Sequence, residues 1–132
     1  MRYMLDTNIC IYLINNKPKK ILSRFKKEEV GNIAISSITL SELKFGAYNS
    51  SNALKNLDAI AKFTTPLEVL PYSEFETDIY GKIRASLKKL GKLIGPNDTL
   101  IAAHAISVNC ILVTNNINEF KNVNGLKLEN WA

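Results

Sequence analysis

Arg2-Tyr3-Met4-Leu5-Asp6 is typical of a short β-strand that ends in an acid, and Thr7-Asn8 leads from it into an apolar helix over about 7–15. A strand followed directly by a helix is the repeating unit of α/β folds. In an open parallel sheet, binding sites form at the carboxyl ends of the strands, which is where Asp6 lies. This stretch therefore predicts the fold class and one residue of a binding site, Asp6.

Strands and helices alternate along the rest of the chain. The expected strands are Asn32–Ser36, Leu67–Leu70, Ile111–Val113 and, at an edge, Leu126–Leu128; the expected helices cover about 18–27, 39–48, 52–63, 73–90 and 96–108. Ile111-Leu112-Val113 is apolar throughout, as in a strand buried on both faces, and Ser73 with Glu76 is typical of a helix-starting capping box. We expect one α/β domain over residues 1–132, an open parallel sheet covered by helices on both faces.

The composition limits the kinds of binding partner and the cellular location that we expect. Seventeen Lys and Arg against twelve Asp and Glu give a net charge of +5, which favours a polyanionic partner. No apolar run approaches the roughly 20 residues of a membrane-spanning helix, and no signal peptide is evident, so we expect a cytoplasmic protein. Cys10 and Cys110 lie in apolar runs without metal-ligand spacing, and we expect reduced, buried thiols.

Three acids stand among apolar neighbours in separate elements: Asp6, Glu42 and Asp98. A buried, unpaired carboxylate costs several kcal/mol or becomes protonated, so such groups are usually paired or bind a cation. Each also has an ordinary explanation: Asp6 as a helix cap, Glu42 as a helix-face residue with a solvated head, and Asp98 as a favourable charge at a helix N-terminus. Convergence of all three predicts a divalent-metal site.

Neighbouring residues support an inward orientation of two of these acids. Glu42 shares a helical stripe with Ile38 and Phe45. Asp98 precedes the apolar positions Ile101 and Ala102 by three and four residues, so it lies at the top of the inward face of its helix. The small side chains that follow it allow this helix to approach the sheet closely.

Several polar residues are candidates for a fourth position or a supporting role: Thr114, Asn116, Glu119 and Asn8. Thr114 is placed to orient a carboxylate, although Thr114-Asn115-Asn116 also has the composition of a simple turn. His104 is the only histidine, which excludes a histidine-based zinc cluster, and we expect it to be packed or hydrogen-bonded. Oxygen ligands alone select Mg²⁺, with Mn²⁺ as a substitute.

The chain resembles the PIN-domain ribonucleases, and among them the VapC-type toxins of bacterial toxin–antitoxin pairs. The matching motifs, in order, are Met4-Leu5-Asp6-Thr7-Asn8, the segment Ser36–Leu43 with Gly46-Ala47, the helix Gly95–Ala105, and Leu112–Asn116 with Glu119-Phe120 and Leu128–Trp131. Many family members carry a fourth acid two residues after the threonine. Asn116 occupies that position here, so Glu119 is the alternative fourth ligand.

The resemblance implies a Mg²⁺- or Mn²⁺-dependent endoribonuclease with Asp6, Glu42 and Asp98 as metal ligands, and tRNA as the first candidate substrate. It further implies a homodimer and a cognate, VapB-like antitoxin whose C-terminal segment covers the acidic pocket. Eight basic residues are candidates for contacting RNA phosphates: Lys17, Lys19, Lys20, Arg24, Arg84, Lys88, Lys89 and Lys92.

Two other classes were weighed against this interpretation. A phosphohydrolase of the haloacid-dehalogenase type needs an aspartate two residues after its nucleophile, where this chain has Asn8, and a phospho-accepting receiver needs an aspartate after Leu67–Leu70. Both are disfavoured. A catalytically impaired PIN-fold module that binds RNA or protein remains the alternative, because Asn116 replaces an acid.

Overall fold

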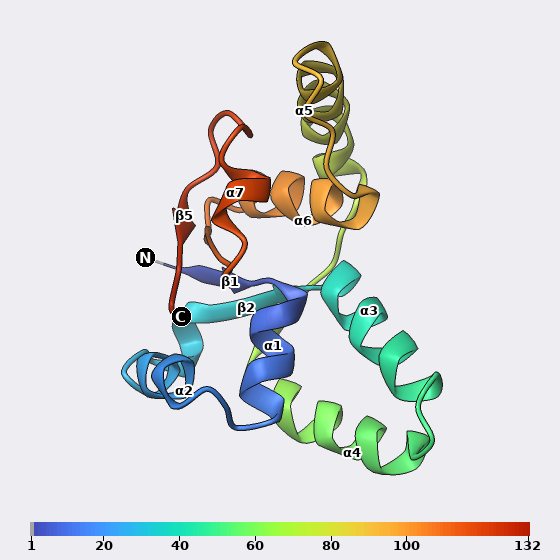
Figure 1. The fold of residues 1–132 in the computed structure, drawn as a ribbon, viewed down its shortest axis with the longest axis vertical. Helices are drawn as coiled ribbons and strands as arrows, with labels where there is room; N and C mark the ends of the chain where they lie inside the picture. The colour runs from blue at the N-terminus through green and yellow to red at the C-terminus, as the bar shows by residue number, and fades with distance from the viewer. Residues whose placement is uncertain (1) are drawn as a thin grey trace.

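Five parallel strands form a single sheet through the centre of the structure, a computed structural model that describes residues 2–132 (Figure 1). The strands are β1 (Tyr3–Leu5), β2 (Ile33–Ser36), β3 (Glu68–Leu70), β4 (Ile111–Val113) and β5 (Leu128–Glu129), in the order β3-β2-β1-β4-β5. Leu5 of β1 pairs with Val113 of β4, and Met4 pairs with Ala34 of β2. The first strand is therefore the central one, with buried neighbours on both sides.

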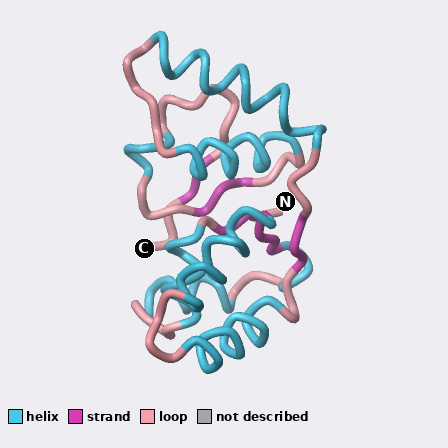
Figure 2. The backbone as a smooth tube through the Cα atoms, turned by 90° about the vertical axis from the view of Figure 1, so that its right-hand side faces the viewer, coloured by secondary structure: helices cyan, strands magenta, loops and turns pink. Residues whose placement is uncertain are grey.

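Helices cover both faces of this sheet, as expected (Figures 1 and 2). They are α1 (Thr7–Ile14), α2 (Lys19–Lys26), α3 (Ser37–Tyr48), α4 (Ala53–Thr64), α5 (Thr77–Lys89), α6 (Pro96–Ser107) and α7 (Ile117–Phe120), with 3-10 turns at Val30–Asn32 and Glu74–Glu76. Helices α1 to α4 share one apolar core with Leu5 and Val113. Helices α5 to α7 share a second core with Met4 and Leu112, whose side chains point the opposite way.

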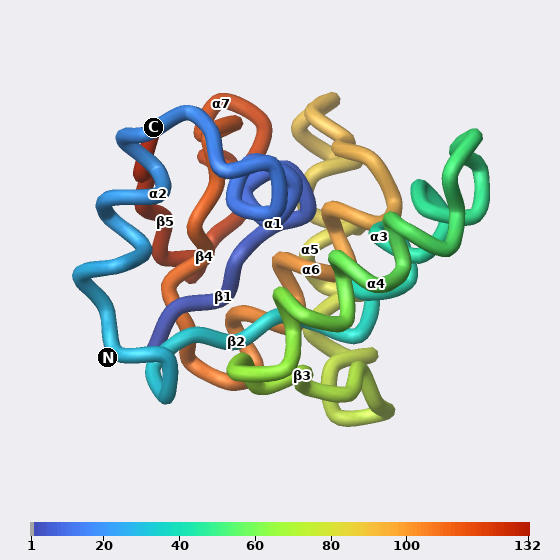
Figure 3. The backbone as a smooth tube through the Cα atoms, turned by 90° about the horizontal axis from the view of Figure 1, so that it is seen from below, coloured from blue at the N-terminus to red at the C-terminus, as the bar shows by residue number. Residues whose placement is uncertain are grey.

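The view from below shows how the first face is arranged (Figure 3). Helix α1 lies over the central strand, with α2 on one side of it and α3 and α4 on the other. Because α1 starts directly after β1, and α3 directly after β2, both helices begin at the carboxyl edge of the sheet. Within residues 2–132, no helix is both long and apolar enough to span a membrane.

Two predicted elements start two residues away from their observed starts, and one helix was not predicted. Helix α3 starts at Ser37 rather than 39, because the Ser36 side chain accepts a hydrogen bond from the Ile38 amide and caps it. The edge strand is Leu128–Glu129 rather than 126–128. Helix α7 was not predicted, because four residues are too few to show a helical period. The predicted capping box of Ser73 and Glu76 is present, and it opens a 3-10 turn that continues into α5.

Replacing a small residue under α6 tests the close approach of this helix to the sheet. Ala102 is completely buried, so Ala102→Leu should lower the free energy of unfolding by about 1–3 kcal/mol through overpacking. Ala85→Leu on the exposed face of α5 is the matched control and should change it by less than about 0.5 kcal/mol. Urea unfolding followed by circular dichroism measures both, and equal effects would contradict close packing of α6.

Candidate active site

Asp6 lies at the junction of β1 and α1. Its backbone amide donates to the carbonyl oxygen of Val113 at 3.0 Å, extending the pairing of β1 with β4. Its Oδ1 accepts from the Ile9 amide at 2.9 Å, so Asp6 does cap α1. The residue is 5% exposed. Burial raises the pKa of Asp6, the hydrogen bonds of Thr114 and Ile9 partly oppose this, and the negative charges of Glu42 and Glu119 raise it further.

The end of β4 supplies the residues beside Asp6. Thr114 is completely buried, its side chain hydrogen-bonds to Asp6, and its Oγ1 accepts from the Asn116 amide at 3.0 Å. The Asn116 Nδ2 in turn donates to Glu119 Oε2 at 2.6 Å. The short helix α7 therefore turns Glu119 back towards the carboxyl edge of the sheet.

Glu42 is oriented by two hydrogen bonds from other elements. Thr7 Oγ1 donates to Glu42 Oε1 at 2.6 Å, and Asn97 Nδ2 donates to Glu42 Oε2 at 3.3 Å. The predicted apolar stripe was wrong in one respect, since Phe45 is 69% exposed. Sequence reasoning did not assign Thr7 or Asn97 this role, although each lies directly beside an acid, at Asp6 and Asp98 respectively.

Asp98 lies in the first turn of α6, behind Pro96 at the start of the helix. Ile101 and Ala102 are completely buried, which confirms the inward face on which Asp98 was placed. Burial raises the pKa of Asp98 to about 7, together with a hydrogen bond to Glu119 and the negative charges of Glu119, Glu42 and Asp6. Asp98 therefore holds a proton to higher pH than an ordinary aspartate, beside the Glu119 carboxyl group.

The four acids Asp6, Glu42, Asp98 and Glu119 lie close enough for their charges to interact. They come from four different segments: Asp6 caps α1, and the other three lie on α3, α6 and α7. Within residues 2–132, no three acidic, histidine or cysteine side chains already form a cage around a cation position. Their oxygens are instead engaged by hydrogen bonds from Thr7, Asn97 and Asn116, and by the contact between Asp98 and Glu119. Direct ligation of a cation by three acids therefore requires side-chain rotation.

The chemistry of this donor set fits a hard divalent cation. Carboxylate and amide oxygens suit Mg²⁺ and Mn²⁺, and bound positive charge would offset the repulsion that raises the pKa values of Asp6 and Asp98. Asn8 is exposed, and the structure gives it no hydrogen bond to these acids within the described residues. The two cysteines are buried and unpaired, as expected.

Comparisons with known proteins agree with this architecture. A family model described as "PIN domain" matches residues 3–126. Ribonuclease VapC2 of Haemophilus influenzae is 47% identical over 132 residues, covering 100% of this chain and 99% of the relative. The tRNA(fMet)-specific endonuclease VapC of Shigella flexneri is 44% identical over 132 residues, with the same coverage.

A solved structure gives the same result. The crystal structure of VapBC2 from Rickettsia felis bound to a DNA fragment from their promoter contains a chain that matches with a TM-score of 0.92 and 44% identity, covering 100% of both chains. The fold and the sequence together define the class, and the chain belongs to the PIN-domain family, within its VapC group. This confirms the resemblance drawn from the four motifs.

The raised pKa of Asp98 predicts a pH-dependent stability. The folded pKa of about 7 exceeds the ordinary value of 3.8, so the folded state holds this proton more tightly, and the stability of the metal-free protein falls as pH rises through that window. Asp98→Asn should therefore raise the free energy of unfolding at pH 8 by about 1–2 kcal/mol, because Asp98 keeps partial contact with water, and change it little at pH 4.

Urea unfolding in EDTA at pH 4, 6 and 8 measures this difference. Asp58→Asn is the matched control, because Asp58 is an exposed acid on α4 that pairs with Lys62; it should not gain stability at high pH. A wild type and Asp98→Asn protein with parallel pH dependences would contradict the raised pKa.

Proposed function

We propose that this protein is a metal-dependent endoribonuclease toxin that hydrolyses phosphodiester bonds in RNA, with tRNA as the first candidate substrate. The observation that carries the proposal is the convergence of four acids at the carboxyl edge of the sheet, where burial and the charges of the other three raise the pKa of Asp98 to about 7. Relatives that span the whole chain are named ribonucleases, and one is named for tRNA(fMet).

In this proposal Asp6, Glu42 and Asp98 hold the cation, and Glu119 takes the place of the family's fourth acid. When bound, the cation supplies Lewis-acid chemistry: it offsets charge on the scissile phosphate and acidifies a water molecule. The protein's part is orientation. Thr114 restrains the Asp6 carboxylate through a hydrogen bond, and Thr7 restrains that of Glu42, which lowers the entropic cost of bringing these oxygens to a cation.

The basic surface supports an RNA partner outside this acidic group. Seven of the eight candidate residues are exposed: Lys17, Lys19, Lys20, Arg84, Lys88, Lys89 and Lys92. Arg24 is the exception, because its side chain is partly buried and engaged in ion pairs. Its guanidinium is 4.8 Å from the Trp131 ring centroid, donates to Glu129, and also pairs with Glu28. Arg24 therefore holds the end of the chain against α2.

An antitoxin partner is part of the same proposal. A surface pocket between α1, α3 and α4 is lined by Glu42 together with apolar side chains: Ile11, Ile14, Leu43, Ala47 and Ile60. Such a pocket suits an apolar peptide segment that runs on to the acids. The solved relatives are VapBC complexes. We expect the antitoxin's C-terminal segment to lie here and to place an Arg or Lys against the acids, on a toxin homodimer.

One observation favours a catalytically impaired binding module as the second candidate. Asn116 replaces a charged ligand and is engaged with Glu119, and no cation cage is ready-made within residues 2–132. Cleavage of RNA by the wild-type chain with Mg²⁺ or Mn²⁺, and its loss in EDTA, separates the two candidates.

Neutralising the acids tests the proposed chemistry. Asp6→Asn, Glu42→Gln and Asp98→Asn should each lower RNA cleavage by well over the ~10–100-fold typical of changes around a metal ligand, because a charged oxygen ligand is lost. A tRNA cleavage assay with Mn²⁺ measures this, with Asp78→Asn on exposed α5 as control. Wild-type cleavage by Asp98→Asn would rule out its assignment.

Asn116, which replaces the fourth acid of many family members, allows a second test of the proposed metal site. Asn116→Asp adds a charged oxygen, so Mn²⁺ affinity should rise, while Glu119→Gln should lower it because Glu119 is the substitute ligand. Calorimetric titration of Mn²⁺ into each protein measures the change. Two variants with wild-type affinity would remove both residues from the site.

Inhibition by the antitoxin should compete with the metal. A C-terminal antitoxin peptide with an Arg against Asp6, Glu42 or Asp98 should weaken Mn²⁺ binding and stop RNA cleavage together. Mn²⁺ titration of the purified toxin–antitoxin complex against free toxin measures this. Unchanged Mn²⁺ affinity in an inhibited complex would mean that inhibition acts elsewhere.

A further inference from the structure

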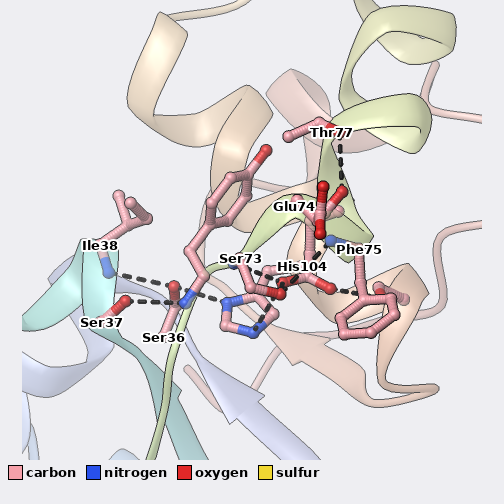
Figure 4. A network of polar contacts seen from close by, with 11 residues as sticks. Ser36, Ser37, Ile38, Ser73, Glu74, Phe75, Thr77 and His104 are labelled. Carbon is pink, nitrogen blue, oxygen red and sulfur yellow. Dashed lines mark hydrogen bonds and ion pairs between the residues drawn. The ribbon is translucent and has the colours of Figure 1, made fainter.

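The hydroxyl of Ser36, the imidazole of His104 and the carboxylate of Glu76 form a buried chain of polar groups; Figure 4 shows the contact between Ser36 and His104. Ser36, His104 and Glu76 are 0%, 1% and 3% exposed. His104 Nδ1 is 2.8 Å from Ser36 Oγ, and His104 Nε2 is 3.9 Å from Glu76 Oε1. The ring of Tyr72 packs edge-on against the imidazole at 5.6 Å between centroids.

The groups around His104 favour the tautomer that carries its proton on Nε2. Ser36 Oγ already accepts from the Ile38 amide at 3.1 Å, so its hydroxyl hydrogen is free to donate to Nδ1. The ring proton then lies on Nε2, which faces Glu76. Burial lowers the pKa of His104, and the charge of Glu76 opposes this, so the neutral ring is the form that this arrangement holds at neutral pH.

Glu76 is held as a carboxylate by donors on three sides. Burial acts to raise its pKa, but hydrogen bonds from the Ser107 hydroxyl and from the Ser73 amide and hydroxyl outweigh burial, and the pKa of Glu76 lies below its ordinary value. The distances are 2.7 Å from Ser107 Oγ and 2.8 Å from the Ser73 amide. These hydrogen bonds hold Glu76 in place at one end of the buried chain of polar groups.

The buried chain of Ser36, His104 and Glu76 connects the helices that carry two of the proposed metal ligands. Ser36 ends β2 and caps α3, the helix of Glu42. His104 belongs to α6, the helix of Asp98. The contact between His104 and Ser36 is therefore a direct polar link between the start of α3 and the last turn of α6, and it is shielded from water.

Ser36, His104 and Glu76 form the sequence of hydroxyl, imidazole and carboxylate that serine hydrolases use. However, Ser36 is completely buried and its Oγ caps α3. No substrate reaches it, so a nucleophilic role is excluded. We propose instead that His104 is a positioning residue. Its link to Ser36 sets α3 against α6 and thereby the separation of Glu42 and Asp98. The inference rests on the metal-dependent function proposed above.

Two substitutions separate the two ends of the imidazole. His104→Asn places an amide oxygen near the Nδ1 position, where it can accept from Ser36. His104→Gln extends its amide to the Nε2 position, where it can donate to Glu76 but leaves the Ser36 hydroxyl hydrogen without its acceptor on residue 104. Both introduce a neutral amide at the same buried site, so their effects on general stability are comparable.

Mn²⁺ affinity, measured by calorimetry without RNA, distinguishes these variants. General destabilisation alone would change it to a similar extent in both. We expect His104→Asn to bind Mn²⁺ within about threefold of wild type, and His104→Gln to bind about tenfold or more weakly, the range for residues that orient metal ligands. In cleavage assays kcat should fall in His104→Gln while KM for RNA stays near wild type. Circular dichroism checks that each protein is folded.

Two further variants complete the test. Ser36→Ala removes the partner of Nδ1 and should match His104→Gln, including when His104→Gln does not fold. Ser107→Ala removes a bond to Glu76 but keeps the His104–Ser36 link, so it should bind Mn²⁺ like wild type. If His104→Gln and Ser36→Ala bind Mn²⁺ like wild type, His104 is purely structural and the inference is wrong. If the wild type itself binds no Mn²⁺, the proposed function fails first.

Discussion

The parallel pairing of β1 with β4 is the constraint on which the site depends. Leu5 lies opposite Val113, and the Asp6 amide continues the ladder to the Val113 carbonyl. As a result Asp6 and Thr114 leave neighbouring strands at the same edge, where a hydrogen bond joins their side chains. The helices that follow β1 and β2 start at this edge too, and they bring Thr7 and Glu42 to it.

Concentrating acids at one edge has an energetic cost, and the structure shows how it is contained. Thr114, Thr7, Asn97 and Asn116 supply hydrogen bonds to the carboxylates, and a hydrogen bond links Asp98 to Glu119. Repulsion that remains is characteristic of functional sites, which are often stabilised less well than the rest of a protein. A partner with positive charge, whether a cation or an antitoxin side chain, would lower the energy of this group.

Much of the fold and part of the site could be predicted from local signals. Asp6 directly ends an apolar strand, and Asp98 precedes an apolar helical face, so both positions followed from periodicity and from the rule for parallel sheets. Glu42 was also singled out by its apolar neighbours on a helix, and the resemblance to a known family supported it. Phe45 showed the limit of that reasoning, because an apolar residue on a helix does not reveal whether another element covers it.

Other features depended on contacts between distant segments. Helix α7 is too short to detect, so the return of Glu119 to Asp98 was only one alternative. Asn97 reaches Glu42 across 55 positions. The Ser73–Glu76 capping box was visible locally, but its second use, at the end of a buried chain through His104 to Ser36, required the packing of α6 against β2 and α5.

The most direct test of the central claim is a crystal structure of the protein grown with Mn²⁺, with anomalous scattering used to locate the metal. The proposed site predicts an anomalous peak at about 2.0–2.3 Å from oxygens of Asp6 and Asp98, with Glu42 or Glu119 completing the ligand set directly or through water. A crystal saturated with Mn²⁺ that shows no peak at the carboxyl ends of β1 and β4 would contradict it.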